Sequence, residues 1–258
     1  MCSGRLYFSY IIYITFMVFS TVRGELVMDL EYKFTRNITG IYRYLFIRKI
    51  DVRGIEGLPS GPKIIVANHF NASDSFTLPF VLKEKLHFVI QGSAFDLPLI
   101  GKLLTIAEQL PVHAGQGLKM IRDAQEKLAA GGCVIIYPEG KLNNGEELLK
   151  AGIGAAFLAL KARVPVVPLG FYVSQKDILV LKWKIFRDYV SSGSWQWRGT
   201  CVLRFGEPFM VTIDSETKRL QTSLRKVTEE IMTRIEQLVE EAQRDIEKSL
   251  TPTCSVKG

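Results

Sequence analysis

The sequence has few of the residues on which metal, disulfide and nucleotide chemistry depend. Four cysteines and three histidines occur in 258 residues, with no Cys-x-x-Cys pair and no histidine at ligand spacing from a cysteine. This argues against a zinc site and against a disulfide scaffold. No Gly-x4-Gly-Lys-Ser/Thr sequence is present, and Gly152-Ile-Gly154 lies inside a helical pattern, so a phosphate-binding loop is not expected. The Gly-x-Ser-x-Gly elbow of serine hydrolases is absent as well.

The composition is that of a folded, basic protein. Hydrophobic residues make up 47% and charged residues 23%, which supports a packed core and excludes global disorder. The net charge of +7 favours anionic partners such as nucleic acid, lipid headgroups or phosphorylated small molecules. We expect no nucleic-acid partner, because the basic residues are dispersed and accompany no helix-turn-helix, zinc or RNA-binding signature. The mean hydropathy of +0.13 is high for a protein surrounded only by water.

The first residues form an uncharged apolar run between Arg5 and Arg23. As a helix, residues 6–22 would be about 25 Å long, slightly short of a ~30 Å hydrocarbon core. A short spanning anchor, an interfacial helix and a signal-peptide core all fit this run, and the lack of an Ala-x-Ala-like cleavage site weakens the third interpretation. We expect an N-terminal membrane helix that is an anchor or is deeply embedded.

Residues 25–49 have apolar positions spaced three and four apart, which predicts a basic amphipathic helix. Its five basic residues and its aromatic residues suit the surface of an anionic leaflet. Packing against its own domain explains the same pattern equally well. Because positive residues follow the first apolar run, the remaining domain is expected on the cytoplasmic face. We therefore divide the chain into membrane-anchoring helices at 1–49 and a globular domain at 50–258.

From residue 50 onward, strand-like and helix-like segments alternate. The expected strands are 63–67, 86–90, 109–112, 133–137, 166–172 and 199–206. The expected helices are 74–83, 97–107, 118–129, 148–162 and 214–248. This alternation predicts an α/β fold whose mostly parallel sheet is flanked by helices. Residues 191–199, which contain two tryptophans, are predicted to form a loop with exposed rings that touches the membrane.

A histidine and an aspartate follow the first of these strands. His69 lies in the loop after residues 63–67, and Asp74 lies five residues later at the start of the next expected helix. Histidine is the natural general base near neutral pH. The Asp74 carboxylate can accept the Nδ1 proton, which leaves Nε2 free to take a proton from a hydroxyl. Alone, a His-x4-Asp pattern is weak, because a polar loop with Asp74 as a helix cap explains it too.

Two further segments follow expected strands. Pro138-Glu-Gly140 comes directly after residues 133–137, and Pro168 interrupts residues 166–172. In an open α/β sheet, ligands bind at the carboxyl ends of strands, so Pro138-Glu-Gly140 and Asn68-His69 are expected on one edge. Taken singly, Glu139 is explained as a turn residue and Pro168 as a feature of an edge strand.

Together the motifs resemble those of the glycerolipid acyltransferase family, which includes the 1-acylglycerol-3-phosphate acyltransferases. Asn68-His69 with Asp74, Tyr137-Pro-Glu-Gly140 and Val166-Val-Pro-Leu-Gly170 have the family's order and spacing. Lys150-Ala-Gly152 and Gly206-Glu-Pro208 fit the family as well, so the resemblance covers about residues 50–210.

The resemblance implies a membrane-associated O-acyltransferase of phospholipid biosynthesis, with residues 50–258 as the acyltransferase domain. It implies acyl-CoA or acyl carrier protein as the donor of a fatty acyl group, with membrane lipids as partners and neither a cofactor nor a metal. The default acceptor is the hydroxyl of 1-acyl-sn-glycerol-3-phosphate. His69 is implied as the general base and Asp74 as its orienting partner in a direct transfer without a protein nucleophile. The implied substrate-binding residues are Asn68, Pro138, Glu139, Gly140, Lys141, Gly152 and Pro168.

This chain departs from the family at two arginines that are thought to hold the acceptor phosphate. The family usually continues Glu-Gly-Thr-Arg-Ser, whereas Leu142 stands in place of the arginine here, and Ala114 replaces a second one. Lys141 offers a point charge instead of a bidentate fork. Cations that could assist it are His113, Lys119 and Arg122. The alternatives left open are another lysolipid acceptor, including an amino-acid-bearing lipid, and a non-catalytic lipid-binding relative.

Overall fold

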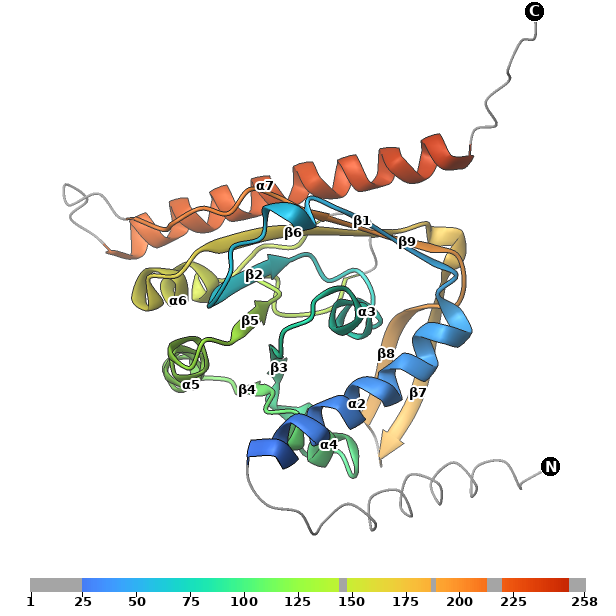
Figure 1. Ribbon diagram of the computed structural model, residues 1–258, viewed down its shortest axis with the longest axis horizontal. Coiled ribbons are helices and arrows are strands. Elements are labelled where there is room, and N and C mark those ends of the chain that lie inside the picture. The colour runs from blue at the N-terminus through green and yellow to red at the C-terminus, as the bar shows by residue number, and fades with distance from the viewer. Residues whose placement is uncertain (1–24, 144–147, 187–188, 213–219, 251–258) are drawn as a thin grey trace, which may run out of the picture.

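A seven-stranded sheet forms the centre of the protein in a computed structural model that describes residues 25–143, 148–186, 189–212 and 220–250 (Figure 1). The strands in spatial order are β1 (Lys49–Arg53), β9 (Thr200–Phe205), β6 (Val166–Val173), β2 (Lys63–Ala67), β5 (Cys133–Ile136), β3 (Leu86–Gln91) and β4 (Leu110–Val112). Every neighbouring pair is parallel except β6 and β9. The α/β fold with a mostly parallel sheet is therefore confirmed.

The central strands β2 and β5 are buried at every position. Their Val- and Ile-rich sequences lack polar alternation because helices cover both faces of the sheet. The two strands run side by side with Val66 paired to Ile136, so their carboxyl ends reach the same edge. The loops that follow them, which carry His69 and Tyr137, consequently start next to each other.

Helices cover both faces of the sheet. The cluster on one face joins Ile64 and Val134 to side chains of α5 (Gly117–Ala129), α6 (Gly154–Ala162) and α7 (Leu220–Leu250). The cluster on the other face joins Ile65 and Ile135 to Leu78 of α3 (Asp74–Val81). Two more helices, α2 (Glu25–Phe46) and α4 (Ile100–Ile106), contact each other, and α2 also contacts α3. In Figure 1, α7 lies along β6, β9 and β1, and α2 lies on the far side of the sheet from it.

Helix α2 confirms the amphipathic helix that the sequence predicts, although it ends at Phe46 because β1 begins at Lys49. Tyr32 and Tyr42 face inward, and the Tyr32 hydroxyl accepts a hydrogen bond from the backbone N–H of Leu86. The opposite face leaves a set of large apolar side chains exposed. This set, called the outer α2 face here, consists of Leu30, Ile41, Tyr44 and Leu45. The helix thus packs on its own domain and keeps an apolar face outward.

The predicted membrane helix at 6–22 lies outside the described residues. Within the described ranges, none of the helices combines the length and the apolar character that crossing a bilayer requires.

The prediction of a loop at 191–199 is wrong for residues 191–196 and holds for residues 197–199. Strand β8 (Tyr189–Gln196) pairs antiparallel with β7 (Ile178–Phe186) in a separate two-stranded sheet. Trp195 is half-buried, because its ring packs against Tyr42 and Phe76 at centroid distances of 5.7 Å each. Trp197 is exposed, as expected.

The predicted helix at 148–162 begins only at Gly154. Two backbone N–H groups of the preceding segment bind the loop after β5 instead of a helical carbonyl. That of Leu149 donates to the Glu139 carboxylate at 2.8 Å, and that of Gly152 donates to the Pro138 carbonyl at 2.9 Å. The segment before α6 is therefore not helical, because it closes the loop that carries the Pro-Glu-Gly motif.

Candidate active site

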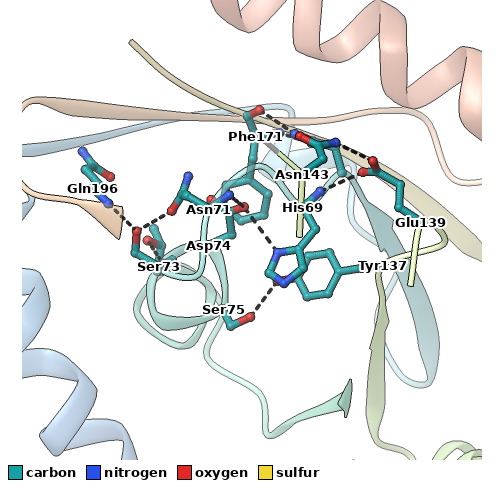
Figure 2. Close-up of polar contacts among 12 residues, drawn as sticks. His69, Asn71, Ser73, Asp74, Ser75, Tyr137, Glu139, Asn143, Phe171 and Gln196 are labelled. Carbon is teal, nitrogen blue, oxygen red and sulfur yellow. Dashed lines mark hydrogen bonds and ion pairs between the residues drawn. The ribbon is translucent and has the colours of Figure 1, made fainter. Parts of the chain in front are cut away.

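Two loops meet at the carboxyl ends of β2 and β5. The first, residues 68–74, runs from β2 into α3, and the second, residues 137–143, follows β5 (Figure 2). They are joined directly by a backbone hydrogen bond of 3.1 Å from the N–H of Asn143 to the carbonyl of His69. The prediction that the two motifs share one edge of the sheet is confirmed.

Asn68 ties the first loop to the neighbouring strand β6. Its side chain is fully buried and pairs with the backbone of Phe171 in both directions. Nδ2 donates to the Phe171 carbonyl at 2.9 Å, and the Phe171 N–H donates to Oδ1 at 2.7 Å. The amide continues the sheet by one residue and fixes the point at which the chain turns toward His69.

His69 and Asp74 face each other across the first loop. The distance from His69 Nδ1 to Asp74 Oδ2 is 3.6 Å, and the Asp74 side chain is 1% exposed whereas that of His69 is 17% exposed. The backbone N–H of Asn71 donates to the same carboxylate oxygen at 3.1 Å. Neither His69 Nδ1 nor Asp74 Oδ1 has a hydrogen-bond partner among the described residues. A small approach of the two side chains would form the Nδ1–H to carboxylate bond, as catalytic contacts often tighten only in the substrate complex.

Burial dominates the acid–base behaviour of Asp74. Removal from water raises the pKa of Asp74 above its ordinary value, while the adjacent His69 and the backbone N–H groups of Asn71 and Phe70 act to lower it. A buried carboxylate is costly unless its charge is paired. An imidazolium at His69 would supply that pairing charge, which is the reason that the neighbouring His69 acts to lower the pKa of Asp74.

Glu139 joins the two loops through its carboxylate, which is 7% exposed. Oε1 accepts the backbone N–H of His69 at 3.0 Å. Oε2 accepts Asn143 Nδ2 at 2.5 Å and the Leu149 N–H at 2.8 Å. These bonds hold the backbone of His69 against the Pro-Glu-Gly loop, so the structure gives Glu139 a positioning contact with the general-base candidate.

The other predicted binding residues lie in two places. Around Glu139, Pro138 is buried, Gly140 and Lys141 are exposed, and Gly152 is bonded to Pro138. Gly140 adopts φ +68°, a backbone conformation that glycine accepts without strain. Pro168 lies apart from them, buried inside β6 and paired with Val66 of β2. Whether these residues contact substrate stays a prediction.

The cations named as substitutes for the missing arginines differ in their surroundings. Lys119 is paired with Asp123 at 2.7 Å, which offsets its charge. His113 and Arg122 are exposed, as is Lys141. Among the described residues, no three His, Cys, Asp or Glu side chains are grouped so that they could hold a metal ion.

Sequence reasoning missed the aromatic and hydroxyl groups around the pair. The Tyr137 ring stacks on the imidazole of His69, and its hydroxyl bonds Ser75. The hydroxyl of Ser73 donates to Asn71 Oδ1 and accepts the backbone N–H of Gln196 at 3.0 Å (Figure 2). The Tyr42 hydroxyl of α2 in turn donates to the Gln196 carbonyl. The sequence feature that could have indicated these contacts is that Tyr137 and Ser75 are next to motif residues in the chain.

Comparison with known proteins points to one family. The acyltransferase family model matches residues 49–172. A chloroplastic 1-acyl-sn-glycerol-3-phosphate acyltransferase of Brassica napus is 29% identical over 126 residues, which cover 47% of this chain and 36% of that protein. The 1-acyl-sn-glycerol-3-phosphate acyltransferase of Pseudomonas aeruginosa is 29% identical over 145 residues, which cover 55% of this chain and 53% of that protein. The chain thus matches about a third to a half of the length of these relatives.

A solved structure supports the fold. The 1-acyl-sn-glycerophosphate acyltransferase PlsC of Thermotoga maritima superposes with a TM-score of 0.61 at 22% identity, over 89% of this chain and 88% of that chain. At this identity the likeness concerns the architecture alone. The order of the motifs, their positions in the fold and the matching family model all indicate a likeness to acyltransferases. Residues 49–172 match the acyltransferase family, and over them the chain is a distant homologue of the 1-acyl-sn-glycerol-3-phosphate acyltransferases.

Proposed function

We propose that the chain is a membrane-associated O-acyltransferase that moves a fatty acyl group from an acyl thioester to a hydroxyl of a lysoglycerolipid. The observation that carries this proposal is the buried Asp74 carboxylate 3.6 Å from Nδ1 of a partly exposed His69, at the carboxyl end of a central parallel strand. A carboxylate at Nδ1 fixes the tautomer in which Nε2 can accept a proton. That arrangement is what a general base for a hydroxyl nucleophile requires.

The reaction proceeds in one ternary complex. Nε2 of His69 removes the proton of the acceptor hydroxyl while its oxygen attacks the thioester carbonyl carbon. The tetrahedral intermediate then expels the thiolate, which takes the proton back from the imidazolium to leave as a thiol. Asp74 orients the ring and stabilises its positive charge. Glu139 holds the His69 backbone in place through the N–H to Oε1 bond of 3.0 Å.

The default acceptor is 1-acyl-sn-glycerol-3-phosphate, because two relatives carry that substrate in their names. The absence of arginine at the two expected phosphate-binding positions favours a second candidate acceptor, a lysolipid with another headgroup. Leu142 and Ala114 stand where the family usually has arginine, and the exposed Lys141 is the cation that directly follows Glu139-Gly140 in the sequence. The donor is acyl-CoA or acyl carrier protein. A non-catalytic lipid-binding relative is the remaining alternative, and the retained His69–Asp74 geometry speaks against it.

We also propose that the domain docks on the cytoplasmic face of a membrane, where both acyl chains reside. The outer α2 face offers apolar side chains, with Ile41 58% and Leu45 63% exposed. Lys33 and Arg43 on the same helix, with Arg48 just beyond it, are exposed and positive. Apolar insertion next to basic residues is the pattern by which helices bind anionic leaflets. Residues 6–22 would add a second anchor.

Replacing His69 by alanine tests the proposed chemistry. Purified chain in lipid micelles is incubated with labelled acyl-CoA or acyl carrier protein and a panel of lysolipids that differ in headgroup, and products are identified by mass. We expect acylation of at least one lysolipid, and we expect His69→Ala to lower kcat by about 10²- to 10⁴-fold because the general base is lost.

His113→Ala is the matched control, since it removes an exposed imidazole outside the His69–Asp74 pair. It should leave kcat unchanged, and any contribution of His113 to headgroup binding should appear in KM. A wild-type chain without acyl transfer to any lysolipid, or a His69→Ala variant with full kcat, would contradict the proposal.

Asp74→Asn should lose activity without losing stability. An amide at this position supports the wrong imidazole tautomer, so we expect kcat to fall by about 10²- to 10⁴-fold. Burial raises the pKa of Asp74 in the folded chain. The folded state therefore binds the extra proton between the unfolded and folded pKa values, and the contribution of Asp74 to stability falls as pH rises through that window.

Asparagine lacks this titration. The free energy of unfolding of Asp74→Asn should therefore rise relative to wild type between about pH 4 and about pH 7, as measured by urea unfolding at both values. A stability difference between the two chains that does not change with pH would show that folding does not raise the pKa of Asp74. An unchanged kcat would remove Asp74 from the mechanism.

Deleting residues 1–23 should weaken but not abolish binding to vesicles that contain anionic lipid, because the outer α2 face remains. Adding Ile41→Glu and Leu45→Glu should then reduce vesicle binding by about tenfold or more, since two charges replace inserted apolar side chains. Leu118→Glu is the control, as Leu118 is 73% exposed on α5 instead. Equal vesicle binding by the two charged variants in a co-sedimentation assay would exclude α2 as the docking surface.

A further inference from the structure

The ring of Tyr137 covers one face of the His69 imidazole. The two ring centroids are 4.0 Å apart and the planes differ by 11°, which is a parallel stack (Figure 2). The edge of the same imidazole faces the Asp74 carboxylate at 3.6 Å from Nδ1. His69 is thus held between a negative charge at its edge and an aromatic π system at its face.

Tyr137 is itself fixed in place by the first turn of α3. Its hydroxyl lies 3.0 Å from Oγ of Ser75, the residue that follows Asp74 in the chain. The Phe88 ring stacks beside it at a centroid distance of 6.5 Å. Burial and the nearby charge of Asp74 raise the pKa of Tyr137, so the phenol keeps its proton and remains neutral. The ring therefore contributes through its π face and not through proton transfer.

We propose that Tyr137 is a positioning residue that stabilises the imidazolium form of His69 through its π face. The proposal rests on the function proposed above for its kinetic consequence. A cation over an aromatic face is attracted by the ring quadrupole, and the attraction is larger where water is excluded. Neutral imidazole gains less from the same contact. The stack therefore lowers the energy of the state in which His69 has taken the acceptor proton, relative to the state before transfer.

The charged groups around His69 are the same in the variants that test this idea. Asp74 faces the ring from α3, Glu139 binds the His69 backbone from the loop after β5, and Lys141 is exposed two residues further on. From β6, the backbone of Phe171 bonds the Asn68 side chain, next to His69 in the chain, and this contact carries no charge. Differences among Tyr137 variants therefore report the ring itself.

The kinetic test is a series at position 137 in the full chain. Tyr137→Phe keeps the ring and should retain kcat within about threefold, whereas Tyr137→Leu should lower kcat by roughly tenfold with KM little changed. Incorporating phenylalanine with an increasing number of ring fluorines weakens the π face at nearly constant size, so kcat should fall stepwise along that series. Tyr172→Leu, which removes a ring packed against Val202 and Ala242, is the control and should leave kcat unchanged.

Equal kcat for the Phe and Leu variants, or no trend with fluorination, would overturn the proposal, because a purely space-filling role predicts both results. Recovery of kcat by Phe but not by Leu supports it.

A second measurement does not depend on activity. The chain has three histidines, so carbon-13-labelled histidine gives few NMR signals, and His69→Ala identifies the one from His69. The pH at which the His69 ring is half-protonated should be lower in Tyr137→Leu than in Tyr137→Phe by about half a unit to one unit. Identical titrations of the two variants would contradict the proposal.

The two measurements separate the two ideas. If the His69 titration differs between Tyr137→Phe and Tyr137→Leu but the wild-type chain transfers no acyl group, the role of Tyr137 is supported and the proposed function is refuted. Acyl transfer by the wild-type chain, with the same His69 titration and the same kcat in Tyr137→Phe and Tyr137→Leu, would support the proposed function and refute the role of Tyr137.

Discussion

The burial of one carboxylate beside one imidazole is the constraint on which the rest of the site depends. Asp74 is almost fully inaccessible to water, and such a charge is tolerated only where hydrogen bonds and an opposite charge offset the lost solvation. The loop supplies the N–H of Asn71, and His69 supplies the charge when it takes a proton. In the proposed mechanism, the imidazolium and the carboxylate stabilise each other once His69 has taken the proton of a substrate.

Three parts of the fold position His69 and Asp74. The parallel strands β2 and β5 bring two loops to one edge, and Glu139 fastens the backbone of His69 to the second loop. Third, α2 donates the Tyr42 hydroxyl to Gln196, whose N–H binds Ser73 next to Asp74. Burial raises the pKa of Tyr42 to about 12, so that donor is kept at all ordinary pH values. Through Gln196, the helix that turns an apolar face outward is therefore connected to the loop that carries His69 and Asp74.

Much of this could be predicted from the sequence, because buried parallel strands are continuous apolar runs and the motif residues follow them directly. The structure places His69 3.6 Å from Asp74 and beside Pro138-Glu-Gly140, as expected, whereas their catalytic roles stay predictions. Strand β8 was missed because its Ser- and Gly-rich sequence shows no alternation of apolar residues. The late start of α6 was missed because the competing bonds come from Glu139, which is distant in sequence. The Tyr137 stack depends on side-chain geometry that no residue pattern encodes.

The most direct test of the central claim is a structure of the chain with a lysolipid and a non-reactive thioether analogue of acyl-CoA. We expect the acceptor hydroxyl oxygen about 3 Å from Nε2 of His69, with Nδ1 and the Asp74 carboxylate drawn to within about 3.2 Å of each other. An acceptor hydroxyl bound out of reach of Nε2, or a carboxylate that turns away from Nδ1 in the complex, would contradict it.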